Sequence, residues 1–232
     1  MKKFELTAEF VTYVFGRKLF RIKALVAFGN VEEGQLGGFV EKEENLSHDG
    51  NAWVSGDACV SGDACVSGDA CVSGHACVSG HARVSGDAYV GGDACVSGHA
   101  YVSGDACVSG HACVSGHARV SGDVCVSGDA CVSGDACVSG HACVSGHAYV
   151  SGDADYAVVT GFGRYFRATT FFRCVDKIPR VQCGCFYGDL AQFREIVKKT
   201  HGDSKYAKEY LAIADLMELH FSDTEEKQEA TK

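Results

Sequence analysis

The chain has 232 residues, of which 46% are hydrophobic and 22% charged, a composition typical of a folded protein. Its formal net charge of −9 disfavours nucleic acid as a partner, because phosphate-backbone binding needs clustered lysine and arginine. No apolar run is long enough to cross a bilayer and no signal peptide is visible, so we expect a cytoplasmic protein that contacts no membrane.

Residues 1–49 are predicted to form an N-terminal β cap. Short strands are expected at Phe4–Thr7 and within Val11–Leu25, with a turn at Phe15–Lys18. The Gly37-Gly38 pair lacks the following helix and lysine of a phosphate-binding loop. A cap is the better interpretation, because the first coil of a repeat protein needs a cover.

Residues 50–155 are predicted to form a β-solenoid. From Val54 to Asp155, seventeen consecutive hexads follow the pattern V-S-G-[D/H]-A-x without an insertion, and Gly50–Trp53 adds a partial hexad. Side chains alternate along a strand, so Ala and Val point to one side and the variable residue to the other. The glycine permits a turn, and such short units can stack as parallel strands around a Val and Ala interior.

This pattern resembles the hexapeptide-repeat family of left-handed β-helices, which place three hexads in each coil. The resemblance implies left-handed coiling, nearly six coils and a homotrimer as the usual assembly. Nearly the whole chain resembles phage and prophage hexapeptide-repeat proteins that are labelled polymer-forming proteins or putative transferases. The segments outside the repeats that carry this likeness are Leu36–Glu41, Thr169–Phe172, Cys183–Phe186 and Thr200–Asp203.

Three hexads per coil place residues 18 apart above one another, in columns. One corner column alternates strictly: Asp57, His75, Asp93, His111, Asp129 and His147. A second corner column holds a run of three histidines: His81, His99 and His117. Decoration left by repeated duplication is the simpler interpretation, and a pH-sensitive or zinc-binding edge is the functional one.

The variable position forms outward columns on the flat faces. Candidates for an interaction face are one cysteine column and one mixed stripe: Cys59, Cys77, Cys95, Cys113 and Cys131, and Arg83, Tyr101 and Arg119. The mixed stripe would continue through Cys137 to Asp155. Stacked thiols could bind a soft metal, but cysteine also behaves as a small hydrophobe on a covered face, which we favour.

Residues 156–221 are predicted to form a small α+β domain, followed by a flexible tail at 222–232. Strands are expected at Tyr156–Gly161, Thr169–Val175 and Arg180–Phe186, then a helix from Gly188 or Asp189 to about Thr200 and a second helix from Ser204. Four side chains could form a zinc site or a cysteine–histidine nucleophile, although core packing is the simpler interpretation: Cys174, Cys183, Cys185 and His201.

Three functions remain open. The first is a non-enzymatic phage or prophage scaffold that presents the C-terminal domain to a host or virion protein and needs no cofactor. The second is a trimeric enzyme, either an acyltransferase using acyl-coenzyme A or a relative of the γ-class carbonic anhydrases. The resemblance to the latter makes His81, His99 and His117 candidate zinc ligands at a subunit interface. The third is an acidic decoy that inhibits a host defence or nucleic-acid enzyme.

Overall fold

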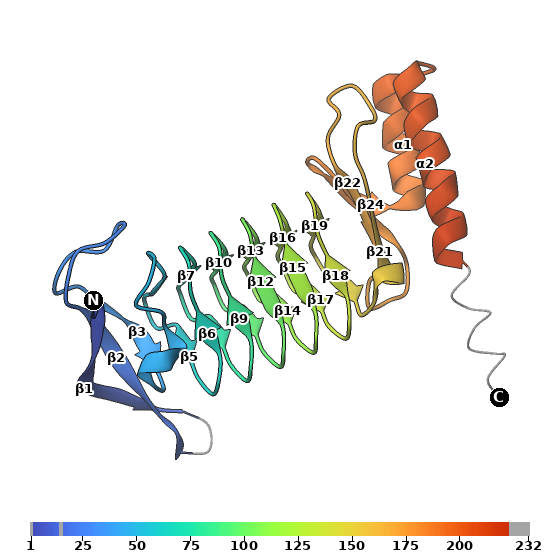
Figure 1. Ribbon diagram of the computed structural model, residues 1–232. Helices are drawn as coiled ribbons and strands as arrows, with labels where there is room; N and C mark the ends of the chain where they lie inside the picture. The colour runs from blue at the N-terminus through green and yellow to red at the C-terminus, as the bar shows by residue number, and fades with distance from the viewer. Residues whose placement is uncertain (1, 14–15, 223–232) are drawn as a thin grey trace, which may run out of the picture.

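The chain is mainly β, as predicted, with a parallel solenoid of about six turns and a small C-terminal α+β part. The structure, a computed structural model, describes residues 2–13 and 16–222. The predicted tail therefore lies outside the described residues, apart from Ser222. The N-terminal strands, the solenoid and the two helices follow one another along the long axis of the molecule (Figure 1).

The N-terminal segment is a hairpin that continues one side of the solenoid. Strand β1 (Phe4–Thr12) pairs antiparallel with β2 (Lys18–Ala24), and β2 pairs antiparallel with β3 (Leu36–Val40). Strand β3 then pairs in parallel with the first repeat strand, β5 (Cys59–Val60). The expected N-terminal strands are present and extend the solenoid. Strand β1, however, runs past the expected end at Thr7, with an irregular register between Leu6 and Phe10.

The solenoid has three parallel sheets, one on each side of the coil. The remaining strands are β4 (Trp53–Val54), β6 (Cys65–Val66), β7 (Cys71–Val72), β8 (Cys77–Val78), β9 (Arg83–Val84), β10 (Tyr89–Val90), β11 (Cys95–Val96), β12 (Tyr101–Ser103), β13 (Cys107–Val108), β14 (Cys113–Val114), β15 (Arg119–Ser121), β16 (Cys125–Val126), β17 (Cys131–Val132), β18 (Cys137–Val138), β19 (Cys143–Val144) and β20 (Tyr149–Val150). Each strand from β4 to β17 pairs with the strand three places later, so Cys59 stands beside Cys77. The 18-residue coil is confirmed, while its left-handedness stays a prediction.

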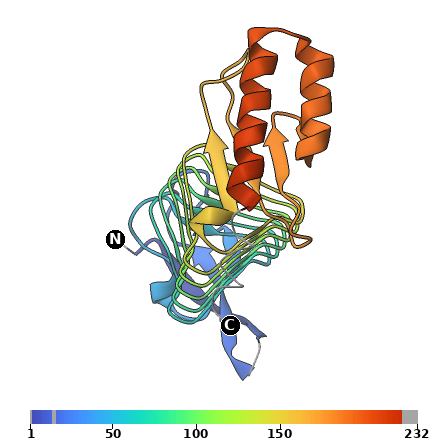
Figure 2. The same ribbon diagram turned by 90° about the vertical axis from the view of Figure 1, so that its right-hand side faces the viewer.

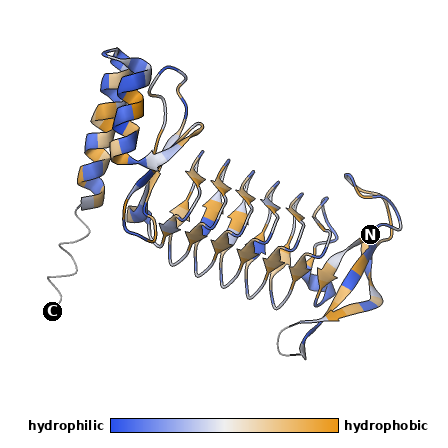
Figure 3. Cartoon of the chain, turned by 180° about the vertical axis from the view of Figure 1, so that it is seen from behind, coloured by the Kyte–Doolittle hydropathy of each residue, from blue (hydrophilic) through white to orange (hydrophobic). Residues whose placement is uncertain are grey.

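Valine and alanine fill the interior of the solenoid. Every Val and Ala of the repeat from Val54 to Val150, including Val124 at an alanine position, is at most 1% exposed. The variable residues from Cys59 to Tyr149 are half-buried or exposed. Seen along the axis, the coils lie over one another (Figure 2). Hydrophobic residues recur in every coil of the solenoid (Figure 3).

The repeat glycines lie at corners where backbone passes directly over backbone. At Gly104, φ is +69°, and a Cβ placed there would lie 2.8 Å from the backbone nitrogen of Gly122 in the next coil. A side chain at this position would therefore be strained in conformation and would also collide with the neighbouring coil.

The C-terminal domain is a four-stranded antiparallel meander covered by two helices. After the turn η3 (Asp153–Asp155), its elements are β21 (Tyr156–Val159), β22 (Thr169–Phe172), β23 (Arg180–Cys183), β24 (Phe186–Asp189), α1 (Leu190–His201) and α2 (Lys205–Ser222). The single strand expected at Arg180–Phe186 is wrong, because Gly184 at φ +60° turns the chain and Cys183 pairs with Phe186.

Strand β22 joins the two halves of the molecule. Its neighbouring side chains point to opposite faces, as alternation along a strand requires. Phe172 is buried in the solenoid core, whereas Phe171 is buried in a separate core with Phe193 and Tyr210 from the helices. The meander thus closes the last coil with one face and carries the helices on the other.

Candidate functional site

Many backbone bonds between coils of the solenoid run the same way. In a typical hexad, three N–H groups donate to carbonyls of the next coil, as from Asp57 N to Gly74 O, Cys59 N to Ala76 O and Ser61 N to Val78 O, each at 2.9 Å. At these positions the first coil presents carbonyl acceptors at its open edge and the last coil presents N–H donors. Unpaired groups of this kind at a sheet edge attract further strands or cost free energy when buried.

At the N-terminal edge, two side chains supply the missing donors. The Asn45 amide, which is completely buried, donates to Gly62 O at 3.0 Å and Ala64 O at 2.7 Å. The Lys3 ammonium donates to Ala52 O at 2.9 Å. Burial lowers the pKa of Lys3, although the charges of nearby aspartates oppose the shift.

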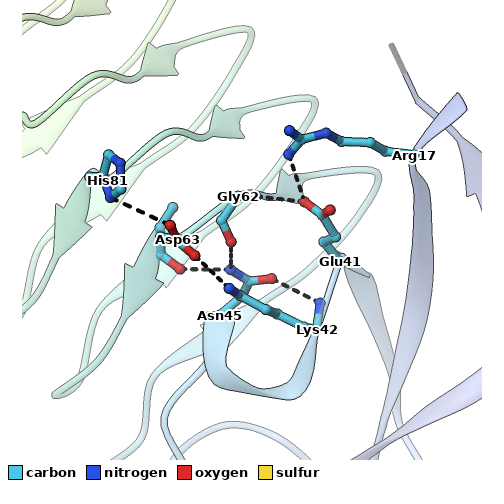
Figure 4. Close-up of polar contacts among 8 residues, drawn as sticks. Arg17, Glu41, Lys42, Asn45, Gly62, Asp63 and His81 are labelled. Atoms are coloured by element: carbon cyan, nitrogen blue, oxygen red, sulfur yellow. Dashed lines mark hydrogen bonds and ion pairs between the residues drawn. The ribbon is translucent and has the colours of Figure 1, made fainter. Parts of the chain in front are cut away.

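Around Asn45, a polar network joins the cap to the second corner column (Figure 4). Arg17 pairs with Glu41 at 3.2 Å, and Lys42 pairs with Asp63 at 2.6 Å. The hydrogen bond from Lys42 holds the pKa of Asp63 below its usual value. Asp63 in turn lies 3.6 Å from His81, so the network ends on a predicted zinc ligand.

At the C-terminal edge, oxygen acceptors close the ladder. Cys137 N donates to Asp153 Oδ1 at 2.8 Å, Cys143 N to Thr170 Oγ1 at 2.9 Å, and Ser151 N to Asp155 Oδ2 at 2.9 Å. The expectation that Asp155 continues the Arg83–Tyr101–Arg119 stripe is wrong, because the chain leaves the coil at η3 and Asp155 turns back to cap it. Both ends of the solenoid are therefore closed by its own chain.

The predicted cysteine column forms one face of the solenoid, in the sheet that contains β3 and β5. Cys59, Cys77, Cys95, Cys113 and Cys131 stand in successive register. Burial raises the pKa of Cys59 to about 11. The hydroxyl of Tyr13 in the hairpin lies 3.5 Å from Cys77 Sγ, and this hydrogen bond raises the pKa of Tyr13 to about 12. Cys59 therefore stays a protonated thiol near neutral pH, a poor nucleophile and a poor metal ligand.

The Arg83–Tyr101–Arg119 stripe lies on a different face, formed by β6, β9, β12, β15 and β18. The Tyr101 ring is 41% exposed and lies between the two guanidinium groups, 5.8 Å from each. These are cation–π contacts. The candidate interaction residues thus belong to two separate surfaces of the rod.

The three stacked histidines form a ladder of parallel rings. His81 and His99 are 4.7 Å apart between centroids with a 4° angle, and His99 and His117 are 5.0 Å apart with a 6° angle. Parallel rings place their nitrogens side by side instead of around a common point. Within the described residues of a single chain, no group of three His, Cys, Asp or Glu side chains is placed to hold a metal. A zinc site shared between subunits stays a prediction.

The Asp–His columns bring carboxylates and imidazoles together as expected. The closest pair joins His141 Nδ1 to Asp123 Oδ2 at 2.9 Å, and the His111–Asp93 pair is longer, at 3.6 Å. Where carboxylates stand next to one another, a hydrogen bond with Asp123 raises the pKa of Asp105, and the charges of Asp123 and Asp87 act in the same direction.

The four candidate residues of the C-terminal domain do not form one cluster. Cys174 is buried in the solenoid core, 4.0 Å from the Tyr187 hydroxyl. Cys183, Cys185 and His201 instead line a common cavity of about 240 Å³ between the β23–β24 turn and the two helices. Thr169 Oγ1 donates to Cys183 Sγ at 3.2 Å, so the thiol has a structural partner.

The remaining walls of this cavity were not singled out from the sequence. Its floor includes Phe193 and Val197 of α1, and its edge carries Arg164, Tyr165 and Arg167 from the β21–β22 connection. A usable signal was present, because the loop interleaves two arginines with three aromatic residues within Phe162–Arg167.

Tyr210 is the polar group at the back of the cavity. Burial raises its pKa to about 12, so its hydroxyl remains protonated, and the His201 ring stacks on it with centroids 5.8 Å apart. Such a mainly apolar hollow with a few polar groups is the usual form of a small-ligand site.

Comparison of the chain with models of protein families gave no match, and a search of curated proteins found no relative. In the part of the chain that the structure describes, no helix is long and apolar enough to cross a membrane.

Proposed function

We propose that the chain is a non-enzymatic scaffold of phage or prophage origin, in which a closed solenoid holds the C-terminal α+β domain as a binding module. The observation that carries this proposal is the unbroken ladder: sixteen hexads in one register from Val54 to Tyr149, a filled interior and no loop excursion between these coils. Acyltransferases of the family that the repeat resembles usually carry such an excursion.

The solenoid with its N-terminal cap and the C-terminal domain carry opposite net charges, which supports different roles for the two parts. Residues 1–155 carry nine Lys and Arg against nineteen Asp and Glu, whereas residues 156–222 carry ten against seven. An acidic rod repels anions along its length while the basic domain at its end attracts them. A partner that binds the domain would accordingly carry negative charge.

Self-association of this scaffold would be lateral. Both edges of the ladder are already paired, by Asn45 and Lys3 at one end and by Asp153, Thr170 and Asp155 at the other. The flat faces instead expose tyrosines, a residue type enriched in interfaces. The exposed tyrosines of the three faces are Tyr89, Tyr101 and Tyr149. A homotrimer packed side by side is the assembly that we propose.

Native mass spectrometry of protein purified from reducing cytosol tests the proposal. We expect chains that carry no cofactor, and a mass of three chains would support the proposed homotrimer. A stoichiometric zinc ion or coenzyme A molecule retained by the wild type would contradict it and support the enzyme alternative. His99→Ala is the matched variant for the zinc case, because it removes the central ring of the histidine ladder.

A further inference from the structure

We propose that the cavity of the C-terminal domain binds a small apolar carboxylic acid, either free or as the carboxyl-terminal residue of a polypeptide. This inference deepens the proposed binding role of the domain and rests on it. Three features of the cavity carry it: its size and apolar floor, the charge at its edge, and the state of the hydroxyl at its back.

The size of the cavity sets an upper limit on the ligand. Its volume of about 240 Å³ lies below the ~300 Å³ at which pockets begin to enclose drug-sized molecules. Phe193 and Val197 from α1 and Phe186 from β24 supply apolar walls. The space therefore suits one aromatic or branched aliphatic group and is too small for a whole coenzyme A molecule.

The charge at the edge selects the sign of the ligand. Arg164 and Arg167 are both exposed, and their guanidinium groups lie 5.5 Å and 5.1 Å from the centroid of the Tyr165 ring. Within residues 2–13 and 16–222, neither forms an ion pair with an acidic side chain. Two such groups held on one aromatic ring offer the planar donor pattern that matches a carboxylate.

Glu209, next to the loop, has partners of its own. It accepts a hydrogen bond from Gly163 N at 3.0 Å and pairs with Lys205 at 3.4 Å. Lys205 therefore offsets part of its charge. The whole chain has a net charge of −9. The lining of this mainly apolar cavity includes arginines and no acidic residue, so the charge at the cavity is positive.

The back of the cavity favours a neutral, apolar end of the ligand. Burial raises the pKa of Tyr210 to about 12, so the hydroxyl donates and carries no charge near neutral pH. A carboxylate pushed inward would lose its hydration among Phe193 and Val197. The ligand is thus oriented with its apolar group inside and its carboxylate at Arg164 and Arg167.

Isothermal titration calorimetry on the full chain tests this site. The probes are phenylacetate, its neutral analogue phenylacetamide, phenyl phosphate, and a short peptide ending in phenylalanine with a free or an amidated carboxyl group. We expect saturable binding of phenylacetate or of the free-acid peptide with a Kd of about 1 mM or lower, and at least about tenfold weaker binding of the neutral partners.

Two sets of variants test separately the contributions of the edge arginines and of the apolar interior to acid binding. Arg164→Gln with Arg167→Gln should weaken acid binding at least about tenfold, and Ile196→Trp should block it by filling the cavity. Arg83→Gln with Arg119→Gln, on the solenoid, is the matched control and should change nothing. Because the substituted arginines are exposed, unfolding temperatures should stay unchanged.

Either source of the acid supports the inference: binding of phenylacetate alone indicates a free acid, and tighter binding of the peptide indicates a chain terminus. It is overturned if neither acid binds up to about 10 mM, if the amides bind equally well, if phenyl phosphate binds more tightly, or if the double arginine variant binds like the wild type. If the chain carries no cofactor and binds no acid, only this inference is contradicted. If the chain retains zinc or coenzyme A, the proposed function is contradicted, whether or not the acid binds.

Discussion

The side-chain amide of Asn45 donates a hydrogen bond of 2.7 Å to the backbone oxygen of Ala64, where a preceding coil would otherwise place its N–H. At the opposite end, Asp153 accepts from the backbone of Cys137. The chemistry of the two caps follows from the bonds at the corners and strand ends, because these leave an excess of carbonyls at one edge and an excess of N–H groups at the other.

Asn45→Leu should destabilise the protein by about 3 kcal/mol, because it leaves two carbonyls and Lys42 N without a partner at a buried edge. Urea unfolding followed by circular dichroism measures the change. Asn51→Ala is the control, since the Asn51 side chain is exposed, and it should shift stability by less than about 0.5 kcal/mol. Equal effects of the two substitutions would refute the capping role of Asn45.

Gly104→Ala should cost at least about 2 kcal/mol more than Gly140→Ala. Both glycines have positive φ, so each substitution carries the same conformational strain. Only at Gly104 would the new Cβ meet the next coil, 2.8 Å from Gly122 N, whereas at Gly140 nothing lies within 4 Å. Thermal unfolding of the two variants compares them directly, and matching losses would show that coil stacking does not constrain the corner.

The sequence predicted the repeated part of the fold well and the unrepeated part less well. The hexads fix both the buried Val and Ala positions and the columns, since a strand alternates its sides and one spacing recurs throughout. Lys3 and Asn45 carry no such signal, because each is a single polar residue whose carbonyl partners lie far along the chain. The cavity was missed for the same reason: Arg164 and Tyr210 meet only after the meander has folded.

Cys59 should react slowly with iodoacetamide at pH 8, lagging behind the exposed Cys185. A pKa of about 11 leaves about one Cys59 thiol in a thousand ionised at that pH, and only the thiolate attacks. Its rate should then climb tenfold per pH unit toward pH 11. Mass spectrometry with fragmentation to locate the label gives both rates, and a Cys59 that labels as fast as Cys185 would contradict the burial of this face.

Asp105→Asn should stabilise the protein at neutral pH. A raised pKa in the folded state means that ionisation of Asp105 opposes folding, so the penalty is absent below the ordinary value of 3.8 and is complete above the folded pKa. The gain in unfolding temperature should therefore fade as the pH falls toward 3.8. Asp93→Asn, beside His111 instead of between carboxylates, should give no such gain, and the same rise in both variants would refute the interaction within the Asp105 column.

Sedimentation velocity over a wide range of protein concentration tests most directly whether both ends of the solenoid are closed. Because the edge carbonyls and N–H groups are already paired, the wild type should sediment as a monomer or one small lateral oligomer of fixed mass, even at the highest concentration. A mass that grows without limit as concentration rises would show that the coils stack end to end, and would contradict the account of the molecule as a finite, capped rod.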